Sequence, residues 1–284
     1  MSARATAAEL STIRHRFAED VCFVAGSTSE RIRAAFATVA REDFLGPGPW
    51  HIVHPLGGYW TTADDDPRHV YHNVVIAIDR TRGLNNGEPS LWARYFDALE
   101  LAPGAAVLHV GCGTGYYSAI LSEIVGPDGR VLAVEIDKEL ASRARDALGR
   151  YRRIDVRHAD GSSLSEREMD AVIISAGATH VLPQWLDALS EGGRLAVPLT
   201  TDRRGGLTLL VTRRGERYAA RSIGWIGIFS CAGGRNAEAE ARLAAAIGKG
   251  HMDMIQSFRR DSHAADGACW LHGPETCVSM RPVH

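Results

Sequence analysis

Residues 106–116 read AVLHVGCGTGY, and they contain the most informative pattern for the fold. An apolar run at 106–110 is predicted to be a strand, GCGTG at 111–115 is a glycine turn, and a helix is predicted at 115–125. Glycines let backbone approach a ligand closely, and a helix N-terminus offers N–H groups to it. Glu135 ends the next apolar run, 20 residues after the turn, where a carboxylate can accept hydrogen bonds from both ribose hydroxyls. The stretch predicts a site for an adenosine-containing cofactor.

Short apolar runs and amphipathic stretches alternate along the rest of the chain. Strands are predicted at 131–134, 154–157, 171–175 and 195–199, and helices at 137–149 and 183–190. This alternation predicts the α/β class, with a Rossmann-like, doubly wound, mostly parallel sheet that carries helices on both faces. The runs 207–212 and 218–228 have no helix between them and predict an antiparallel hairpin at the end of the sheet.

Three segments are expected along the chain. Residues 1–83 are predicted to form a helical N-terminal cap and a substrate loop, with Ser27 and Glu30 as a capping box at a helix start. Residues 84–228 form the cofactor-binding core, and its first helix is predicted to begin at Pro89. Residues 229–284 are a C-terminal extension with a helix at about 236–259, expected to help form the acceptor pocket without contacting the cofactor.

Composition narrows the class of protein. The 284 residues are 45% apolar and carry a formal charge of −2, which gives no electrostatic reason to expect a nucleic-acid partner or an anionic membrane. No apolar run is long enough to span a bilayer, and the first residues lack a signal-peptide core. Five cysteines without a CxxC pair argue against a disulfide scaffold. A cytoplasmic globular protein is expected, while the oligomeric state is left open.

The residue at the sixth position of the glycine motif distinguishes between two possible classes of cofactor. A dinucleotide fingerprint has a third glycine there, whereas this chain has the bulky Tyr116. The pattern GxGxG followed by an acid at a strand end favours S-adenosylmethionine, whose methionine part carries no phosphate. A nicotinamide-dependent oxidoreductase is the weaker alternative.

The chain resembles the protein-L-isoaspartate O-methyltransferase family. The resemblance lies in LHVGCGTGYYSAILSEIVGPDGRVLAVEID, in Asp160-Gly161, in DAVIISAGATHVLPQWLDALSEGGRLAVPL and in Asn86-Gly87-Glu88-Pro89, and it spans roughly residues 28 to 200. It implies a doubly wound α/β sheet, S-adenosylmethionine as cofactor and methyl transfer to a carboxylate. It also implies that Gly111, Gly113 and Gly115 line the methionine end, that Glu135 holds the ribose, and that Asp160 and Gly161 contact the adenine.

Two sets of candidate site residues follow. The cofactor-binding set consists of the residues above together with Asn86, His109, Tyr116, Ile136 and Ser175. The catalytic set is Asn86, Ser90 and His180.

Two positions depart from the family pattern. His109 stands where relatives carry an acid that organises the amino end of the cofactor, and Gly87 stands where they carry a serine or threonine that positions the substrate carboxylate. Asn85, Asn86 or Ser90 could supply a substitute hydrogen bond. We therefore expect poor activity on isoaspartyl peptides.

The expected reaction is O-methylation of a carboxylate on a peptide, a protein or a small metabolite. Such an acceptor is ionised at neutral pH and needs no general base. One alternative is an N- or O-methyltransferase of natural-product biosynthesis that uses His109 or His180 as base for an amine or hydroxyl. Another is a non-catalytic protein that binds S-adenosylmethionine.

The C-terminal extension also contains possible metal ligands. Cys269, His272 and Cys277, with His263, could bind zinc. Because no CxxC pair is present, an apolar cluster around Trp270 is favoured and no metal is expected.

Overall fold

The computed structural model describes residues 4–202 and 205–283, and it divides into two compact units. The first unit comprises residues 4–104, 112–133 and 137–156, and the second comprises 105–111, 134–136 and the described part of 157–283. Two strands, β6 (Arg130–Glu135) and β7 (Ile154–His158), begin in the first unit and end in the second. No helix among the described residues is long and apolar enough to cross a membrane.

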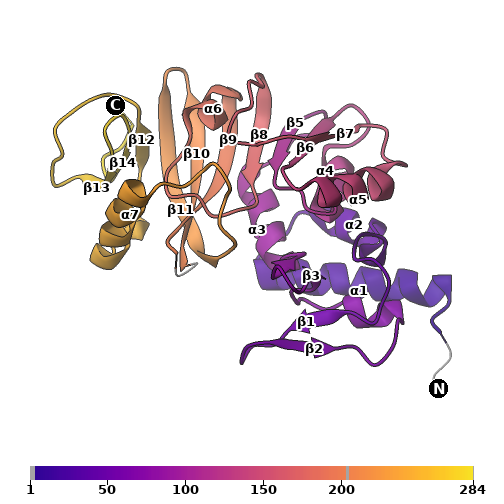
Figure 1. The fold of residues 1–284 in the computed structure, drawn as a ribbon. Helices are drawn as coiled ribbons and strands as arrows, with labels where there is room; N and C mark the ends of the chain where they lie inside the picture. Colours follow the sequence, from indigo (N-terminus) through magenta and orange to yellow (C-terminus); the bar gives the residue numbers. More distant parts are fainter. Residues whose placement is uncertain (1–3, 203–204, 284) are drawn as a thin grey trace. The chain divides into compact units, whose positions relative to one another are not determined.

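The first unit is mainly helical (Figure 1). Its helices are α1 (Ala7–Ala25), α2 (Glu30–Thr38), α3 (Pro89–Leu99), α4 (Tyr116–Val125) and α5 (Lys138–Leu148), with short 3-10 helices η1 (Arg41–Phe44) and η2 (Pro67–Val70). Two small hairpins pair β1 (His51–Val53) with β2 (Tyr59–Thr61) and β3 (Ala77–Asp79) with β4 (Leu84–Asn85). The predicted start of α3 at Pro89 is confirmed.

The predicted capping box at Ser27 is wrong. Helix α2 is capped two residues later, by Ser29, whose hydroxyl accepts from the Ile32 amide at 3.4 Å. Gly26 ends α1 in the left-handed conformation, so the chain is still turning at Ser27. The Ser27 hydroxyl instead donates to Asp97 of α3 at 2.7 Å.

The second unit is built on a sheet whose neighbours follow the order β5, β8, β9, β10, β11, β12, β14, β13 (Figure 1). Its strands are β5 (Ala106–Val110), β8 (Met169–Ile174), β9 (Leu189–Thr200), β10 (Gly205–Arg214), β11 (Arg217–Gly227), β12 (Ser257–Arg259), β13 (Cys269–His272) and β14 (Cys277–Ser279). Strands β5, β8 and β9 are parallel, as predicted. From β9 onward all neighbours are antiparallel, which confirms the predicted hairpin and continues it into the C-terminal extension.

The helix predicted at 236–259 is shorter than expected. Helix α7 spans Ala237–Lys249, and it is followed by the 3-10 helix η3 (Met252–Met254) and by β12. Gly250 and His251 both have positive φ, which a right-handed helix does not allow. The short helix α6 (Pro183–Asp187) lies within the predicted range 183–190.

Candidate active site

The glycine turn joins a buried strand to a buried helix. Every residue of β5 is buried, and Gly111, Gly113 and Gly115 after it all have positive φ. At Gly115 a side chain would also meet Leu148, whose Cδ1 lies 2.6 Å from the position of a Cβ atom. Only glycine combines this left-handed backbone with such close packing, so the local structure accounts for the motif.

Backbone hydrogen bonds align the strand ends of the second unit. The Ser175 amide donates to the Val110 carbonyl at 2.9 Å, the Gly111 amide to Val134 at 2.7 Å, and the Ala159 amide to Glu135 at 3.1 Å. The residues directly after β8, β5 and β7 and the last residue of β6 therefore lie next to one another. In α/β sheets, ligands bind at the carboxyl ends of the parallel strands. Glu135 is only 6% exposed there, so its carboxylate is held at the edge of the core.

The segment Asp160–Ser162 is held in one conformation. Asp160 Oδ1 accepts from the Ser162 amide at 2.8 Å, and the Gly161 carbonyl accepts from the Trp185 indole at 2.8 Å. A Cβ atom on Gly161 would overlap the Val110 side chain, which explains the glycine. The carboxylate and backbone amides beside it can recognise an adenine edge.

The beginning of the C-terminal extension packs against that same segment. A Cβ atom on Gly233 would overlap the Ser162 hydroxyl and lie 3.3 Å from Asp160 Oδ1. Burial and the nearby Asp160 carboxylate raise the pKa of Cys231 to about 11. Gly233 and Cys231 therefore lie close to the segment that is predicted to bind adenine, although the extension is expected to serve only the acceptor.

His109 is a buried, neutral histidine. Its Nε2 lies 2.7 Å from the Ser175 hydroxyl, and His109 is only 1% exposed. Burial lowers the pKa of His109 to about 3, because no solvent stabilises the imidazolium. At neutral pH it is an uncharged hydrogen-bonding group, and its low basicity disfavours it as a general base. Ile136, by contrast, is 47% exposed directly after Glu135.

Asn86 is oriented by a buried arginine that sequence reasoning missed. Arg41 is 0% exposed and donates from Nε to Asn86 Oδ1 at 3.1 Å. Its remaining donors reach backbone carbonyls at 2.8–3.3 Å, namely those of Val70, His72, Val74 and Gly87. All five guanidinium N–H groups are thus used, and they join the loop 70–74 to residues 86–87. Arg41 lies outside any recognisable motif, so the sequence carried no signal for this role.

Ser90 stabilises the start of α3. Its hydroxyl lies 2.7 Å from Glu88 Oε1 and accepts from the side-chain Nδ2 of Asn73 at 2.9 Å. The backbone amide of Ser90 donates to Asn73 Oδ1 at 2.9 Å. The residue is 1% exposed. These contacts give Ser90 a local structural role at the predicted catalytic loop.

Tyr116 and His180 differ in their surroundings. The ring of Tyr116 packs against Phe44, with centroids 5.6 Å apart, in the aromatic core of the first unit. His180 is half-buried in the second unit, where its Nδ1 lies 3.1 Å from the Thr179 hydroxyl. Burial and the positive charge of Arg242 lower the pKa of His180 and favour its neutral form.

The predicted residues thus fall into two groups. Those that the second unit brings together along its strand ends are His109, Gly111, Glu135, Ile136, Asp160, Gly161 and Ser175. Asn86, Ser90, Gly113, Gly115 and Tyr116 belong to the first unit. His180 also belongs to the second unit, but no strand-end hydrogen bond described above involves it.

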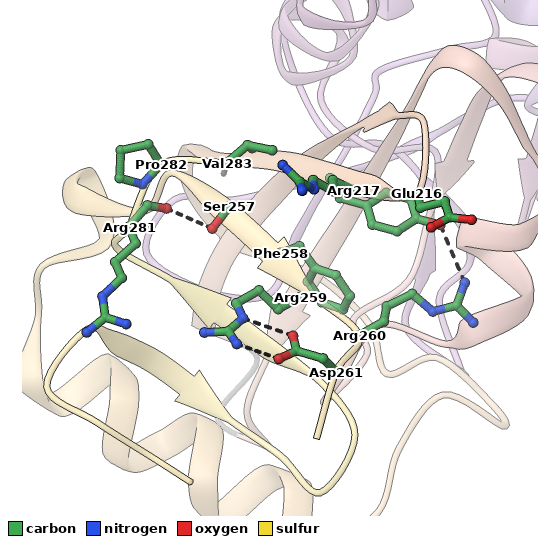
Figure 2. A pocket seen from close by; sticks show the side chains of 11 residues that line it. Glu216, Arg217, Ser257, Phe258, Arg259, Arg260, Asp261, Arg281, Pro282 and Val283 are labelled. Atoms are coloured by element: carbon green, nitrogen blue, oxygen red, sulfur yellow. Dashed lines mark hydrogen bonds and ion pairs between the residues drawn. The ribbon is translucent and has the colours of Figure 1, made fainter. Parts of the chain in front are cut away.

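A separate cavity of about 600 Å³ lies at the other end of the sheet (Figure 2). Tyr218 and Phe258 in its wall pair with each other, and the strand registers align them with the amino ends of β8 and β9. Arginines in the wall form ion pairs, including Arg259 with Asp261 and Arg260 with Asp187. This cavity is therefore distinct from the strand ends that carry the candidate site.

Sequence comparisons identify the family. The family model of protein-L-isoaspartate(D-aspartate) O-methyltransferase matches residues 61–224, more than half of the chain. The chain is 32% identical over 217 residues to the protein-L-isoaspartate O-methyltransferase of Pyrobaculum neutrophilum, covering 75% of this chain and 95% of that protein. It is 37% identical over 191 residues to the enzyme of the same name from Methanopyrus kandleri, covering 66% and 76%.

Solved structures agree on the fold. A protein-L-isoaspartate O-methyltransferase superposes with a TM-score of 0.64 at 22% identity, covering 86% of this chain and 72% of that one. A structure from Plasmodium falciparum, described as a protein-L-isoaspartate O-methyltransferase in complex with S-adenosyl-L-homocysteine, gives a TM-score of 0.59 at 15% identity, covering 77% of this chain and 97% of that one. The predicted α/β class and methyltransferase assignment are confirmed, and the chain belongs to the protein-L-isoaspartate(D-aspartate) O-methyltransferase family.

Proposed function

We propose that this chain transfers the methyl group of S-adenosylmethionine to a carboxylate of a peptide or protein. The observation that carries the proposal is the alignment of Gly111, Glu135 and Asp160 along adjacent strand ends of one unit. Membership of the family supports the same activity.

The residues present suit this cofactor. Glu135 offers a buried carboxylate for the two ribose hydroxyls, and Asp160 and the amide of Gly161 offer an acceptor and a donor for adenine. In the glycine turn the Thr114 hydroxyl is buried without a hydrogen-bond partner among the described residues. A buried polar atom of this kind normally has a partner, and a bound ligand would provide one.

The chemistry needs no proton transfer. A carboxylate oxygen attacks the methyl carbon while the bond from carbon to sulfur breaks, which gives a methyl ester and S-adenosylhomocysteine. Alignment of the reacting atoms supplies most of the catalysis. An amine or hydroxyl acceptor would benefit from a base, and burial makes His109 a poor one. The carboxylate acceptor therefore agrees better with the site.

Asn86 is the residue we propose as the contact to the acceptor carboxylate. Because Arg41 can only donate, the amide oxygen of Asn86 must face it, which leaves the amide Nδ2 as the donor on the other side. Amide N–H groups suit a carboxylate. Asn86 precedes Gly87, the position where relatives are expected to carry a serine or threonine hydroxyl, so its Nδ2 is a donor close to that position.

The test is a methyl-transfer assay with S-adenosylmethionine labelled in its methyl group. An isoaspartyl peptide, its aspartyl counterpart and a set of small carboxylic acids serve as acceptors. We expect methyl esters, which release methanol in base, on a peptide carboxylate. Base-stable methylation, or binding of S-adenosylmethionine by calorimetry without any ester product across the acceptors, would contradict the proposal.

A further inference from the structure

Four potential metal ligands meet in the C-terminal extension. His263, Cys269, His272 and Cys277 each offer one nitrogen or sulfur atom, and all four atoms lie within 4.8 Å of one another. A tetrahedral zinc site with bonds of about 2.0–2.3 Å places its ligand atoms roughly 3.3–3.8 Å apart. Small side-chain rotations would therefore bring this cluster to coordination geometry.

A β-bulge explains how the sequence pattern produces the cluster. Cys269 and His272 are three residues apart, so in a regular strand they would face opposite sides of the sheet. In β13 the register shifts between Cys269 and Leu271, which inserts one extra residue and returns His272 to the side of Cys269. His272 is directly opposite Cys277 of β14, and directly opposed residues share a face. Because a bulge cannot be read from the sequence, the spacing of Cys269 and His272 did not predict a metal site.

The fourth ligand comes from the loop before β13 and is oriented for coordination. His263 Nδ1 lies 3.0 Å from the Asp261 carbonyl oxygen, which can only accept, so this nitrogen carries the proton. The lone pair is then on Nε2, which lies 3.5 Å from the Cys269 sulfur. Metal-binding histidines usually donate their other N–H in this way.

Two further contacts fit a metal-bound thiolate and imidazole. The Asp266 amide donates to the Cys269 sulfur at 3.5 Å, a contact that stabilises negative charge on sulfur. His272 Nδ1 is buried and has no hydrogen-bond partner within residues 4–202 and 205–283. Cys277 is 0% exposed, and the other three residues of the cluster are partly buried.

We propose that His263, Cys269, His272 and Cys277 form a structural zinc site. Two thiolates and two imidazoles are ligands that zinc prefers, and four protein ligands leave no open position for catalysis. The sequence favoured an apolar cluster around Trp270 at this point. Trp270 is buried, with its indole donating to the Gly250 carbonyl at 2.7 Å, but the ligand cluster lies beside it.

The role of the ion is to hold together short strands at the end of the sheet. Strands β12, β13 and β14 contain only three or four residues each, so their ladders contribute few hydrogen bonds. The ion joins β13 and β14 to the loop that follows β12. Arg259, the last residue of β12, and Asp261 in this loop line the cavity of Figure 2. Metal binding of this kind contributes directly to folding free energy.

The first test is the metal content of the full-length protein, purified without chelators or affinity tags that bind metal. Mass spectrometry of the elements should find about one zinc ion per chain, the stoichiometry of a closed four-ligand site. Cobalt exchanged into the site should show the ligand-field absorption of a tetrahedral ion with thiolate ligands. Removal of zinc by a chelator should lower the melting temperature, and added zinc should restore it.

Variants assign the ion to these residues. Cys269→Ser with Cys277→Ser, and separately His263→Ala, should reduce the bound zinc at least tenfold, since each removes ligands. Cys22→Ser is the matched control, because Cys22 is a buried thiol of α1 outside the cluster, and it should retain the ion.

Three outcomes would overturn the proposal, and the first two need only the unmodified protein. The first is a purified protein that contains no zinc and does not retain added zinc after dialysis. The second is a disulfide between Cys269 and Cys277 in the purified chain. The third is that the folded cluster variants bind as much zinc as Cys22→Ser does.

Discussion

A Cβ atom on Gly87 would lie 2.7 Å from the indole Nε1 of Trp92. Trp92 is itself stacked on Tyr117, with ring centroids 4.1 Å apart and planes inclined by 12°. The Tyr117 hydroxyl donates to the Gly87 carbonyl at 3.2 Å. Packing of these rings therefore accounts for glycine at this position, while the poor activity expected on isoaspartyl peptides stays a prediction.

Gly87→Ser should destabilise the protein and should not simply restore a hydroxyl. Gly87 has φ of +67°, and a left-handed backbone costs a side chain about 1–2 kcal/mol while overpacking adds about 1–3 kcal/mol. Gly58→Ser is the control, because Gly58 has φ of +75° with nothing within 4 Å of its Cβ position. Urea denaturation should show a larger loss for Gly87→Ser than for Gly58→Ser. Equal losses would show that Trp92 yields without strain.

Arg41→Lys should destabilise the first unit although it keeps the charge. Lysine has three donors where arginine uses five, so at least two of the five acceptors lose their partner. Each buried acceptor left unsatisfied costs about 1–3 kcal/mol. The free energy of unfolding should fall by roughly 2–6 kcal/mol, as measured by denaturant titration. A variant as stable as the parent would mean that water replaces the guanidinium.

Glu135→Gln should weaken binding of S-adenosylmethionine by about ten- to a hundredfold, because hydrogen bonds to a charged acceptor contribute about 1.5–3 kcal/mol. Isothermal titration calorimetry measures the change. Glu139→Gln serves as control, since its side chain is 72% exposed and lies near the start of α5. If both variants bind as the parent does, Glu135 is not the ribose ligand.

Gly233→Ala should also weaken cofactor binding, because its methyl group would displace Ser162 and, through it, Asp160. Gly215→Ala has a similar positive φ and open space around the Cβ position, so it reports the backbone strain alone. Calorimetry should separate the two variants. Unchanged affinity in folded Gly233→Ala would remove the C-terminal extension from the cofactor site.

His109 should make the fold sensitive to acid. The pKa of His109 is lowered to about 3 in the folded protein, while an unfolded chain has the ordinary value of about 6.5. Between these values the unfolded state binds a proton that the folded state does not, so this residue causes stability to fall as pH decreases from about 6.5 toward 3. Above 6.5 its contribution is constant.

His109→Gln isolates this effect. The stability difference between parent and variant should shift in favour of the variant as pH is lowered from 7 to about 5, in the window that the two pKa values define. Chemical denaturation at each pH measures it. A difference that stays constant over this range would mean that folded His109 takes up the proton as easily as the unfolded chain does.

The α/β core, the glycine turn and the acid at the end of β6 could all be predicted from the amino-acid sequence. These features depend on local pattern: the run 106–110 is apolar throughout, glycine permits positive φ after it, and Pro89 suits a first helical turn. The lengths of the elements were harder to predict. Helix α7 ends earlier than predicted, and β12 after it pairs with β11 and β14, a pairing that the local sequence pattern does not indicate.

Contacts between side chains distant in sequence could be seen only in the folded chain. Arg41 reaches carbonyls about 30 to 46 positions away, and its own neighbours in the chain give no hint of them. Gly87 is explained by Trp92 and Tyr117, and the His263, Cys269, His272 and Cys277 cluster by one extra residue in β13. The physical reason is the same in each case. The burial of a side chain and the partners of its polar atoms depend on how the whole chain packs, and the periodicity of two residues in a strand or 3.6 in a helix does not predict them.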